Sequence, residues 1–339
     1  MTDGRRAYIG SFTTAGGPGL VTAQVDARSG ALTVLSRLDD LADPSYLALS
    51  RGGDTLYAVS ETSEGTVAAY RVGRDEPEPA GPAVRVGEGP THLGLFAGHV
   101  LTADYGSGSV TAVPLHPDGT LTGPASGALR HTGSGPCPQR QREPHAHQVQ
   151  PDPSGRWAVS VDLGTDSVRV CTLADGVPVL HRETALEPGS GPRHLAFHPD
   201  GTRAYVVNEL RPTVTVCRWD AAGGVLTPLA ETGVLPAAPA GDAYPSGIAV
   251  SCDGRFVWTA TRGEDVLSVL AVDGEDLRLI TTVPCGGHWP RALTAHGRRL
   301  YVANERSGDV TWFTVDPDTG VPHREGSVGL PAASCVIIG

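Results

Sequence analysis

Histidines, arginines and carboxylates in this sequence are placed where they can supply acid–base and anion-binding chemistry. His145 and His147 form a His-Ala-His motif, Arg193 precedes Glu209 by sixteen residues, and Arg262 lies in a Thr-Arg-Gly triplet. An imidazole or a carboxylate can take a proton from water, and a guanidinium can hold an oxyanion or dock a carboxylate or phosphate. These groups can support the hydrolysis of an ester-like bond, or the abstraction of a proton beside a carboxylate.

A repeated segment positions these residues. Residues Pro192–Glu209 read PRHLAFHPDGTRAYVVNE, which is an apolar run, a Gly-centred turn and a second apolar run, the pattern of a β-hairpin. Looser copies begin at Pro44, Pro90, Pro144, Pro245 and Pro290. A third and a weaker fourth run follow in most copies, such as TVTVCR at 213–218. Units of four strands with a period in the forties predict a β-propeller.

The two ends of the chain supply the remaining blade. Six copies run from Pro44 to Val328. Three apolar runs precede them and one follows, namely Ala7–Ser11, Leu20–Val25, Ala31–Leu35 and Ala333–Ile338. Joining these runs completes a blade and removes an open sheet edge. The sequence therefore predicts an all-β, seven-bladed propeller formed by residues 1–339 as a single domain, with the N- and C-terminal strands paired in one blade.

Composition limits the partners and the compartment. A net charge of −11 argues against nucleic acid and anionic membranes as partners, and no apolar run approaches the length of about 20 residues that spans a membrane. Cys171, Cys217 and Cys335 lie in predicted strands, and no CxxC pair occurs. The start MTDGRRAYIG enters a strand without a secretory signal. We expect a cytoplasmic monomer with reduced thiols.

The repeat also gathers polar side chains at one rim of the central channel. The first two strands of each blade are antiparallel, so the start of the first and the end of the second lie at the same rim. The strand starts carry Ser45, His92, His145, His147, Arg193, His194, Ser246 and Arg291. The strand ends carry Glu61, Asp104, Asp162, Glu209, Arg262 and Glu305. A dense ring of both charges at a concave mouth predicts the functional site.

Each of these residues also has a structural explanation. Carboxylates such as Glu61 and Asp104 can pair with neighbouring cations or cap strand ends, Arg193 and Glu209 can be an ion pair only, and Arg291 can be a surface residue. The basic loop 130–142 can cover the mouth, and it can equally be a solvated excursion. If it covers the mouth, it places Arg140 and Arg142 near a phosphate.

The most specific segments resemble the seven-bladed propeller lactonase family, which includes bacterial 6-phosphogluconolactonase and shares its fold with a fungal 3-carboxy-cis,cis-muconate lactonizing enzyme. These segments are GSGPCPQRQREPHAH (133–147), DLGTDSV (162–168), GSGPRHLAFHPDG (189–201) and YVVNEL (205–210). The resemblance covers the whole chain and implies catalytic roles for His145, Arg193, Glu209 and Arg262. The chain departs from the family pattern at Ser60, Ala260 and Ala292, and these departures bear on the identity of the substrate.

The favoured function is a lactone hydrolase that opens a sugar-acid lactone such as 6-phosphogluconolactone, using base-activated water and an arginine-stabilised oxyanion. A small organic anion is the expected substrate, and its predicted binding residues are His147, His194, Arg291, Arg140, Arg142 and Glu305. No cofactor or metal is predicted, although His145, His147 and Glu209 leave a metal-dependent variant open. A lactonizing lyase or isomerase and a non-catalytic binding propeller remain as alternatives.

Overall fold

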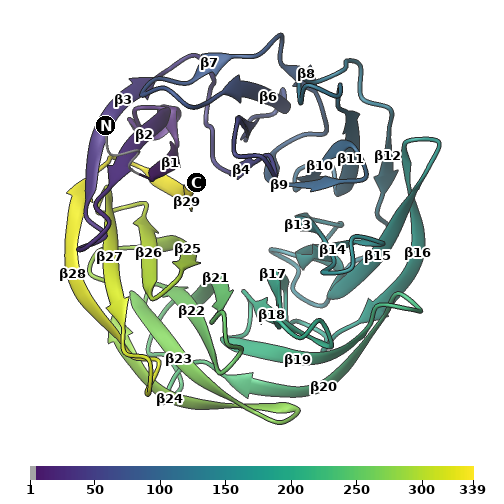
Figure 1. The fold of residues 1–339 in the computed structure, drawn as a ribbon. Helices are drawn as coiled ribbons and strands as arrows, with labels where there is room; N and C mark the ends of the chain where they lie inside the picture. The colour runs from purple at the N-terminus through teal and green to yellow at the C-terminus, as the bar shows by residue number, and fades with distance from the viewer. Residues whose placement is uncertain (1–4) are drawn as a thin grey trace.

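Seven small antiparallel sheets stand around a central channel in the structure, a computed structural model that describes residues 5–339 (Figure 1). The strands next to the channel are β29 (Ala333–Ile338), β4 (Leu47–Leu49), β9 (Pro90–Phe96), β13 (Ala146–Pro151), β17 (Pro192–Phe197), β21 (Tyr244–Val250) and β25 (Pro290–His296). The second strands are β1 (Arg6–Ser11), β5 (Thr55–Ser60), β10 (His99–Asp104), β14 (Ala158–Asp162), β18 (Arg203–Asn208), β22 (Phe256–Arg262) and β26 (Arg299–Asn304).

The outer half of each blade consists of a third strand and a more exposed fourth one. The third strands are β2 (Leu20–Val25), β6 (Thr66–Arg71), β11 (Ser109–Pro114), β15 (Ser167–Ala174), β19 (Thr213–Asp220), β23 (Val266–Asp273) and β27 (Asp309–Val315). The fourth strands are β3 (Leu32–Leu38), β12 (Gly127–Arg130), β16 (Val177–Ala185), β20 (Val225–Gly233), β24 (Asp276–Pro284) and β28 (Pro322–Gly329), and in one blade the pair β7 (Glu78–Pro79) and β8 (Val84–Arg85).

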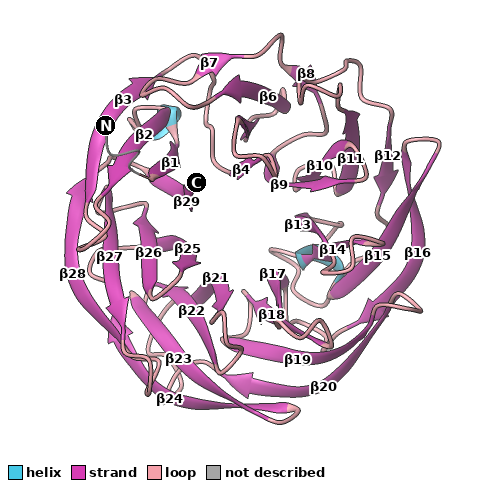
Figure 2. Ribbon diagram, viewed as in Figure 1, coloured by secondary structure: helices cyan, strands magenta, loops and turns pink. Residues whose placement is uncertain are grey.

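Burial explains the composition of these strands. The second strands are apolar at successive positions, as in Ala204–Val207, because each sheet is covered on both faces by neighbouring blades. The fourth strands lie at the outside, and β20 mixes buried and exposed positions accordingly. Two 3-10 helices, η1 (Thr13–Ala15) and η2 (Leu163–Thr165), are the helices of the described chain (Figure 2). No helix among residues 5–339 is long and apolar enough to cross a membrane, and the six cysteines are free.

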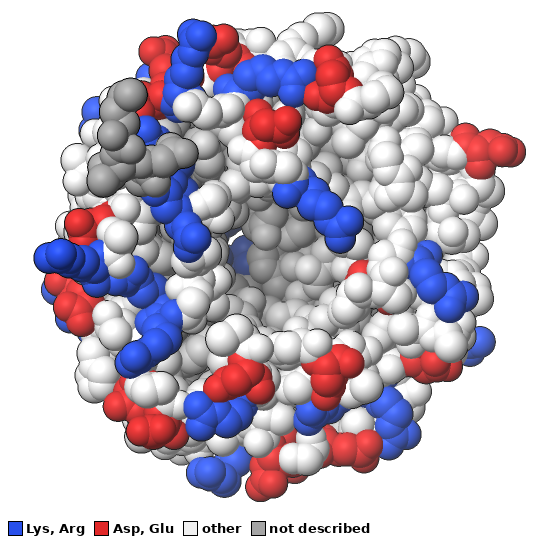
Figure 3. Space-filling view, viewed as in Figure 1, with Lys and Arg blue, Asp and Glu red and all other residues white. Residues whose placement is uncertain are grey.

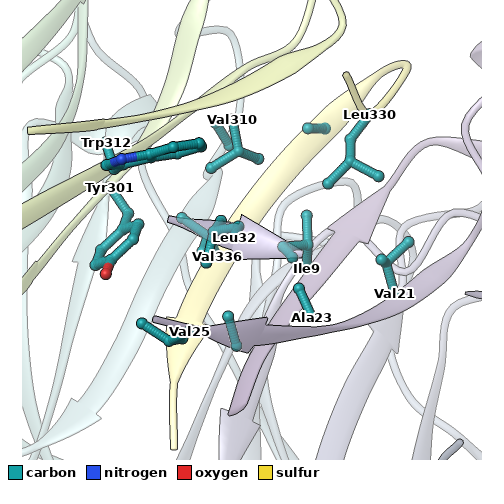
Figure 4. Close-up of a cluster of buried hydrophobic side chains, with 13 residues drawn as sticks. Ile9, Val21, Ala23, Val25, Leu32, Tyr301, Val310, Trp312, Leu330 and Val336 are labelled. Atoms are coloured by element: carbon teal, nitrogen blue, oxygen red, sulfur yellow. The ribbon is translucent and has the colours of Figure 1, made fainter. Parts of the chain in front are cut away.

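The chain termini close the ring in one blade, as predicted from the sequence. β29 pairs antiparallel with β1, with Ile9 opposite Val336, and the sheet order is β29-β1-β2-β3. Side chains from this blade pack against Tyr301, Val310 and Trp312 of the blade before it (Figure 4). The pairing therefore removes two sheet edges and completes a hydrophobic layer between the first and last parts of the chain.

Ile9→Ala tests how much this closing layer contributes to stability. Ile9 is fully buried, so its truncation should lower the free energy of unfolding by about 2–5 kcal/mol through lost burial and the cavity left behind. Denaturant unfolding followed by fluorescence measures the change. Leu180→Ala is the control, because Leu180 is 41% exposed and its loss should change stability by at most about 0.5 kcal/mol. Equal effects of the two substitutions would contradict the assignment of Ile9 to the closing core.

Candidate active site

Irregular strand pairing at the channel rim aims side chains into the mouth. In six of the seven inner strands the register shifts near the start, as between Pro192 and His194 in β17 and between Pro290 and Ala292 in β25. Such a bulge adds one residue to a strand and redirects its side chain. The extra residues of β17 and β25 are Arg193 and Arg291.

The strand pairing changes which histidine of the His-Ala-His motif is equivalent to Arg193. Ala146 pairs with Asp162 in the way that Pro192 pairs with Asn208. His147 therefore takes the place that Arg193 has in its blade, and His145 lies just before the strand. The sequence repeat, aligned on Pro144, does not reveal this two-residue offset.

The strand ends also correct two predicted members of the rim. Asp104 and Asp162 are the last residues of β10 and β14, and both are fully buried within their blades. Asp104 accepts hydrogen bonds from Thr102 (2.7 Å) and Thr111 (2.6 Å). The next residue along each second strand is the one that reaches the channel, because successive side chains of a strand point to opposite sides. That position holds Glu61, Tyr105, Leu163, Glu209, Arg262, Glu305 and, in the closing blade, Phe12.

Asp104 should make stability depend on pH. Burial raises the pKa of this carboxyl to about 6, against the hydrogen bonds from Thr111, Thr102 and Ser109, whereas an unfolded Asp titrates near about 3.9. The folded state thus binds the proton more tightly. The stabilisation that comes from this tighter proton binding is fully present below pH ~4 and is lost as the pH rises through about 6.

Asp104→Asn should therefore be more stable than the wild type at pH 7, with the difference vanishing near pH 4. The equivalent residues Asn208 and Asn304 already donate to threonine hydroxyls at 3.0 and 3.1 Å, so an amide suits this position. Thermal unfolding from pH 4 to pH 8 measures the effect, and Asn304→Asp should show the opposite trend. A constant difference between Asp104→Asn and wild type across this range would contradict the prediction.

Glu209 is the centre of a cluster of three arginines from different parts of the chain. Its Oε2 lies 3.0 Å from Nε of Arg193 and 2.7 Å from Nη2 of Arg262, and its Oε1 lies 2.6 Å from Nη2 of Arg140. Arg193 also donates from Nη1 to the Ser246 carbonyl at 2.8 Å. Glu209, Arg193 and Arg262 are buried, whereas the side chain of Arg140 is 35% exposed. Arg140 is the outermost member of the cluster.

The cluster fixes the protonation of its members. Burial alone would raise the pKa of Glu209, but Arg262, Arg193 and Arg140 outweigh it and lower the pKa to about 2. Burial and the neighbouring Arg262 lower the pKa of Arg193 to about 9. Glu209 is consequently ionised at neutral pH, and with both oxygens engaged by guanidiniums it is a weak proton acceptor.

A second ionic group occupies the other side of the channel. Arg291 lies 3.2 Å from Glu61 and 3.3 Å from Glu305, and its guanidinium is 4.7 Å from the ring centroid of Phe12. Burial opposes the charge of Arg291, but Glu61 and Glu305 raise its pKa. This group carries one net negative charge, and the Glu209 cluster carries two net positive charges. The two sets together leave one positive charge near the mouth.

Buried imidazoles form a layer next to Arg193, whose Nη1 lies 3.4 Å from Nε2 of His194. The ring of His194 lies 5.2 Å from that of His147 and 5.5 Å from that of His92, and His92 packs 3.9 Å from Tyr46. Burial and the positive charge of Arg193 lower the pKa of each histidine, to about 3 for His92, so all three are neutral. Nδ1 of His92 and Nδ1 of His147 have no hydrogen-bond partner among residues 5–339.

The channel continues past this layer. A cavity of about 250 Å³ is lined by Tyr46, Gln148, His194 and the inner-strand residues beyond them. Arg193, Glu209 and Arg262 do not line it. Figure 3 shows one face of the ring, which is hollowed at its centre and carries charges of both signs around the rim. The arginine cluster and this cavity are therefore two separate parts of the channel.

His145 and Tyr105 connect the loop 130–145 to the cluster. The two rings stack with centroids 4.2 Å apart, and Nδ1 of His145 lies 2.9 Å from the Tyr105 carbonyl oxygen. A carbonyl only accepts, so Nδ1 carries a proton, and in the neutral ring Nε2 is the basic nitrogen. The Tyr105 hydroxyl accepts a 3.4 Å hydrogen bond from Arg140. Tyr105 was not among the residues predicted from the sequence, although it follows Asp104 as Glu209 follows Asn208.

Most of the predicted binding residues lie around the channel, with one exception. Arg140 joins the Glu209 cluster, His147 and His194 belong to the imidazole layer, and Glu305 pairs with Arg291. Arg142 is exposed, and its Nε donates to the Pro138 carbonyl at 2.7 Å within its own loop. Loop 130–142 therefore contributes one arginine to the mouth rather than two. Among residues 5–339, no three His, Cys, Asp or Glu side chains are grouped so that they could hold a metal ion.

Comparisons with known proteins agree with this architecture. A Bacillus subtilis protein named 6-phosphogluconolactonase is 32% identical, with 97% of each chain covered. A Pseudomonas aeruginosa structure described as a periplasmic gluconolactonase has a TM-score of 0.91 at 28% identity, covering 98% of each chain. A Lactobacillus plantarum structure has a TM-score of 0.92 at 28% identity, covering 99% of each chain. The family described as "Lactonase, 7-bladed beta-propeller" matches residues 6–338, and the chain belongs to this lactonase family.

Proposed function

We propose that this lactonase hydrolyses a small anionic sugar-acid lactone, with 6-phosphogluconolactone as the first candidate. The observation that carries the proposal is the buried Glu209 cluster, in which one carboxylate holds three arginines at the mouth beside His145, whose Nδ1 bonds the Tyr105 carbonyl. The name of the Bacillus relative supports the choice of substrate.

His145 is the proposed general base. Its Nδ1–H is held by the Tyr105 carbonyl, so its Nε2 lone pair can accept a proton from water. Glu209 is poorly suited to this role because three guanidiniums stabilise its ionised form. Glu209 instead positions Arg140, Arg193 and Arg262.

Arg262 is the proposed donor to the oxyanion. Its Nε donates to the Tyr244 carbonyl at 3.2 Å and its Nη2 contacts Glu209, so Nη1 is left to bind substrate. Arg140, the more exposed arginine, is suited to dock the phosphate or carboxylate of the substrate. The net positive charge of the cluster favours an anion there, although the whole chain carries a charge of −11.

The proposed reaction uses one water molecule. Water oxygen attacks the lactone carbonyl carbon while His145 Nε2 takes its proton, and Arg262 stabilises the oxyanion that forms. Collapse of this intermediate breaks the ring C–O bond, and the imidazolium returns the proton to the leaving alkoxide. The product is a hydroxy acid, which ionises at neutral pH and releases one proton.

A lactone panel assayed by proton release tests the function. We expect a rate above spontaneous opening for 6-phosphogluconolactone, and a higher KM for gluconolactone, which lacks the anionic group. Parallel assays with a chelator test for metal dependence. Equal processing of both lactones would contradict the anionic substrate.

Inactivity on lactones would contradict the proposed hydrolysis and would direct attention to the two other classes. Turnover of an unsaturated dicarboxylate would then identify a lactonizing enzyme. Binding without turnover of either substrate would identify a binding propeller. We place the reaction in a monomer in the cytoplasm, where the six unpaired cysteines would remain reduced.

A further inference from the structure

Trp289 occupies a turn whose equivalent place holds glycine in two other blades. Its amide donates to Oδ1 of Asp265 at 2.8 Å, and its φ is +64°. In the turn before β17, the amide of Gly191 donates to Oδ1 of Asp166 at the same distance, and its φ is +60°. The following contacts also match, because Arg306 N donates to the His288 carbonyl as Leu210 N donates to that of Ser190.

The backbone of this turn favours glycine. A positive φ is uncommon for residues with a side chain and is disfavoured for a bulky one, whereas glycine adopts it readily. The turn before β9 likewise has glycine, Gly89, with φ +56°, whereas the turns before β4 and β29 hold the small residues Asp43 (+46°) and Ala332 (+52°). The fold therefore gives no backbone reason for tryptophan at 289, and a strained residue beside a charged cluster suggests that its side chain has a function.

The indole of Trp289 lies against the arginine that we assign to the oxyanion. The guanidinium carbon of Arg262 is 5.6 Å from the Trp289 ring centroid and 6.0 Å from that of Tyr244. The two rings are 6.2 Å apart at an angle of 65°. The guanidinium of Arg306 is 3.3 Å from the Trp289 centroid. Two neighbouring aromatic rings thus lie beside the guanidinium of Arg262, and a second cation packs on the tryptophan.

We infer that Trp289 is a positioning residue that, with Tyr244, holds the guanidinium of Arg262 in the orientation that directs Nη1 at the substrate. The aromatic rings attract the cation and limit its rotation, while the Tyr244 carbonyl and Glu209 fix Nε and Nη2. This inference rests on the proposed function, in which Arg262 is the oxyanion donor. It assigns the orientation of that donor to a residue outside the Glu209 cluster.

A double-mutant cycle between Trp289→Gly and Arg262→Gln tests the inference. Trp289→Gly should lower kcat/KM about 10-fold, the scale of a partly buried cation–π contact. In the Arg262→Gln background the same change should have less than about a 2-fold effect, because coupled residues are non-additive. Trp289→Phe, which keeps an aromatic face, should recover part of the loss. The unfolding temperature of Trp289→Gly should equal or exceed that of wild type, since glycine relieves the strained φ.

Ala97→Gly is the matched control, because Ala97 also has a positive φ, +46°, in the hairpin between β9 and β10. It should relieve strain in the same way and leave kcat/KM unchanged. An equal fold-loss in both Arg262 backgrounds would show that Trp289 contacts substrate directly and would overturn the inference. Wild-type activity of Trp289→Gly, or a large drop in its unfolding temperature, would overturn it as well.

The failure of the proposed function can be told from the failure of this inference. If wild type opens no lactone, the proposed hydrolysis fails, and the cycle is repeated on the binding of 6-phosphogluconate by calorimetry. Loss of affinity in Trp289→Gly only when Arg262 is present would still support the positioning role. Additive losses of affinity would overturn it.

Discussion

Glu209→Gln should lower kcat/KM by about 10³-fold or more, because the substitution keeps the shape of the side chain and removes the charge that holds three arginines. Losing one positioned oxyanion donor typically costs about 10²–10³ in rate, and here Arg140, Arg193 and Arg262 share the one carboxylate. The protein should also lose about 3–5 kcal/mol of stability, because buried guanidiniums are left without a counter-ion. Steady-state kinetics and denaturant unfolding measure the two effects.

Glu305→Gln provides a matched comparison for this variant. Glu305 contacts Arg291 at 3.3 Å, its side chain is 24% exposed, and Glu61 remains to pair with the same arginine. Its loss should reduce kcat/KM by less than about 10-fold, because the pair is more solvated. If the two variants behave alike, the Glu209 cluster has no special role in the reaction.

His145→Gln should lower kcat by about 10²–10⁴-fold with little change in KM, the range expected for loss of a general base. Glutamine can still donate to the Tyr105 carbonyl but supplies no basic nitrogen, so binding should survive while proton transfer fails. Initial rates over a range of lactone concentrations separate the two parameters.

His147→Gln distinguishes the two histidines of the motif. Burial and Arg193 lower the pKa of His147 far below its usual range, so it is a poor base, and its replacement should affect kcat less than that of His145. A larger loss of kcat in His147→Gln than in His145→Gln would transfer the role of base to His147.

The repeat identified Arg193, Glu209 and Arg262 of the Glu209 cluster because it is regular in sequence. Arg193 and Glu209 lie at the two ends of one β-hairpin, so their sixteen-residue spacing already predicts that they face each other, and the structure separates them by 3.0 Å. The seven-bladed ring and its closure were also predictable. Six complete copies leave three apolar runs at the start of the chain and one at its end, and together these four make the seventh blade.

Side-chain direction at the rim could not be read from the repeat. Alternation along a strand has a period of two residues, so an error of one residue exchanges the blade interior for the channel. Asp104 was predicted to lie at the mouth, whereas it is buried in its blade and the next residue, Tyr105, reaches the site. The same difficulty arises at the strand starts, since the repeat aligned on Pro144 puts His145 opposite Arg193, whereas the strand register puts His147 there.

The sequence by itself determined the fold, the blade count and most of the residue types at the channel mouth, because these follow from local hydrophobic periodicity repeated along the chain. Tertiary structure alone decided which residues of different blades and loops meet. Arg140 reaches Glu209 from 69 residues away, and Trp289 flanks Arg262 from the next blade. Such contacts depend on how separate blades are rotated around the channel and on where loops fold back, and no local spacing in the sequence encodes that arrangement.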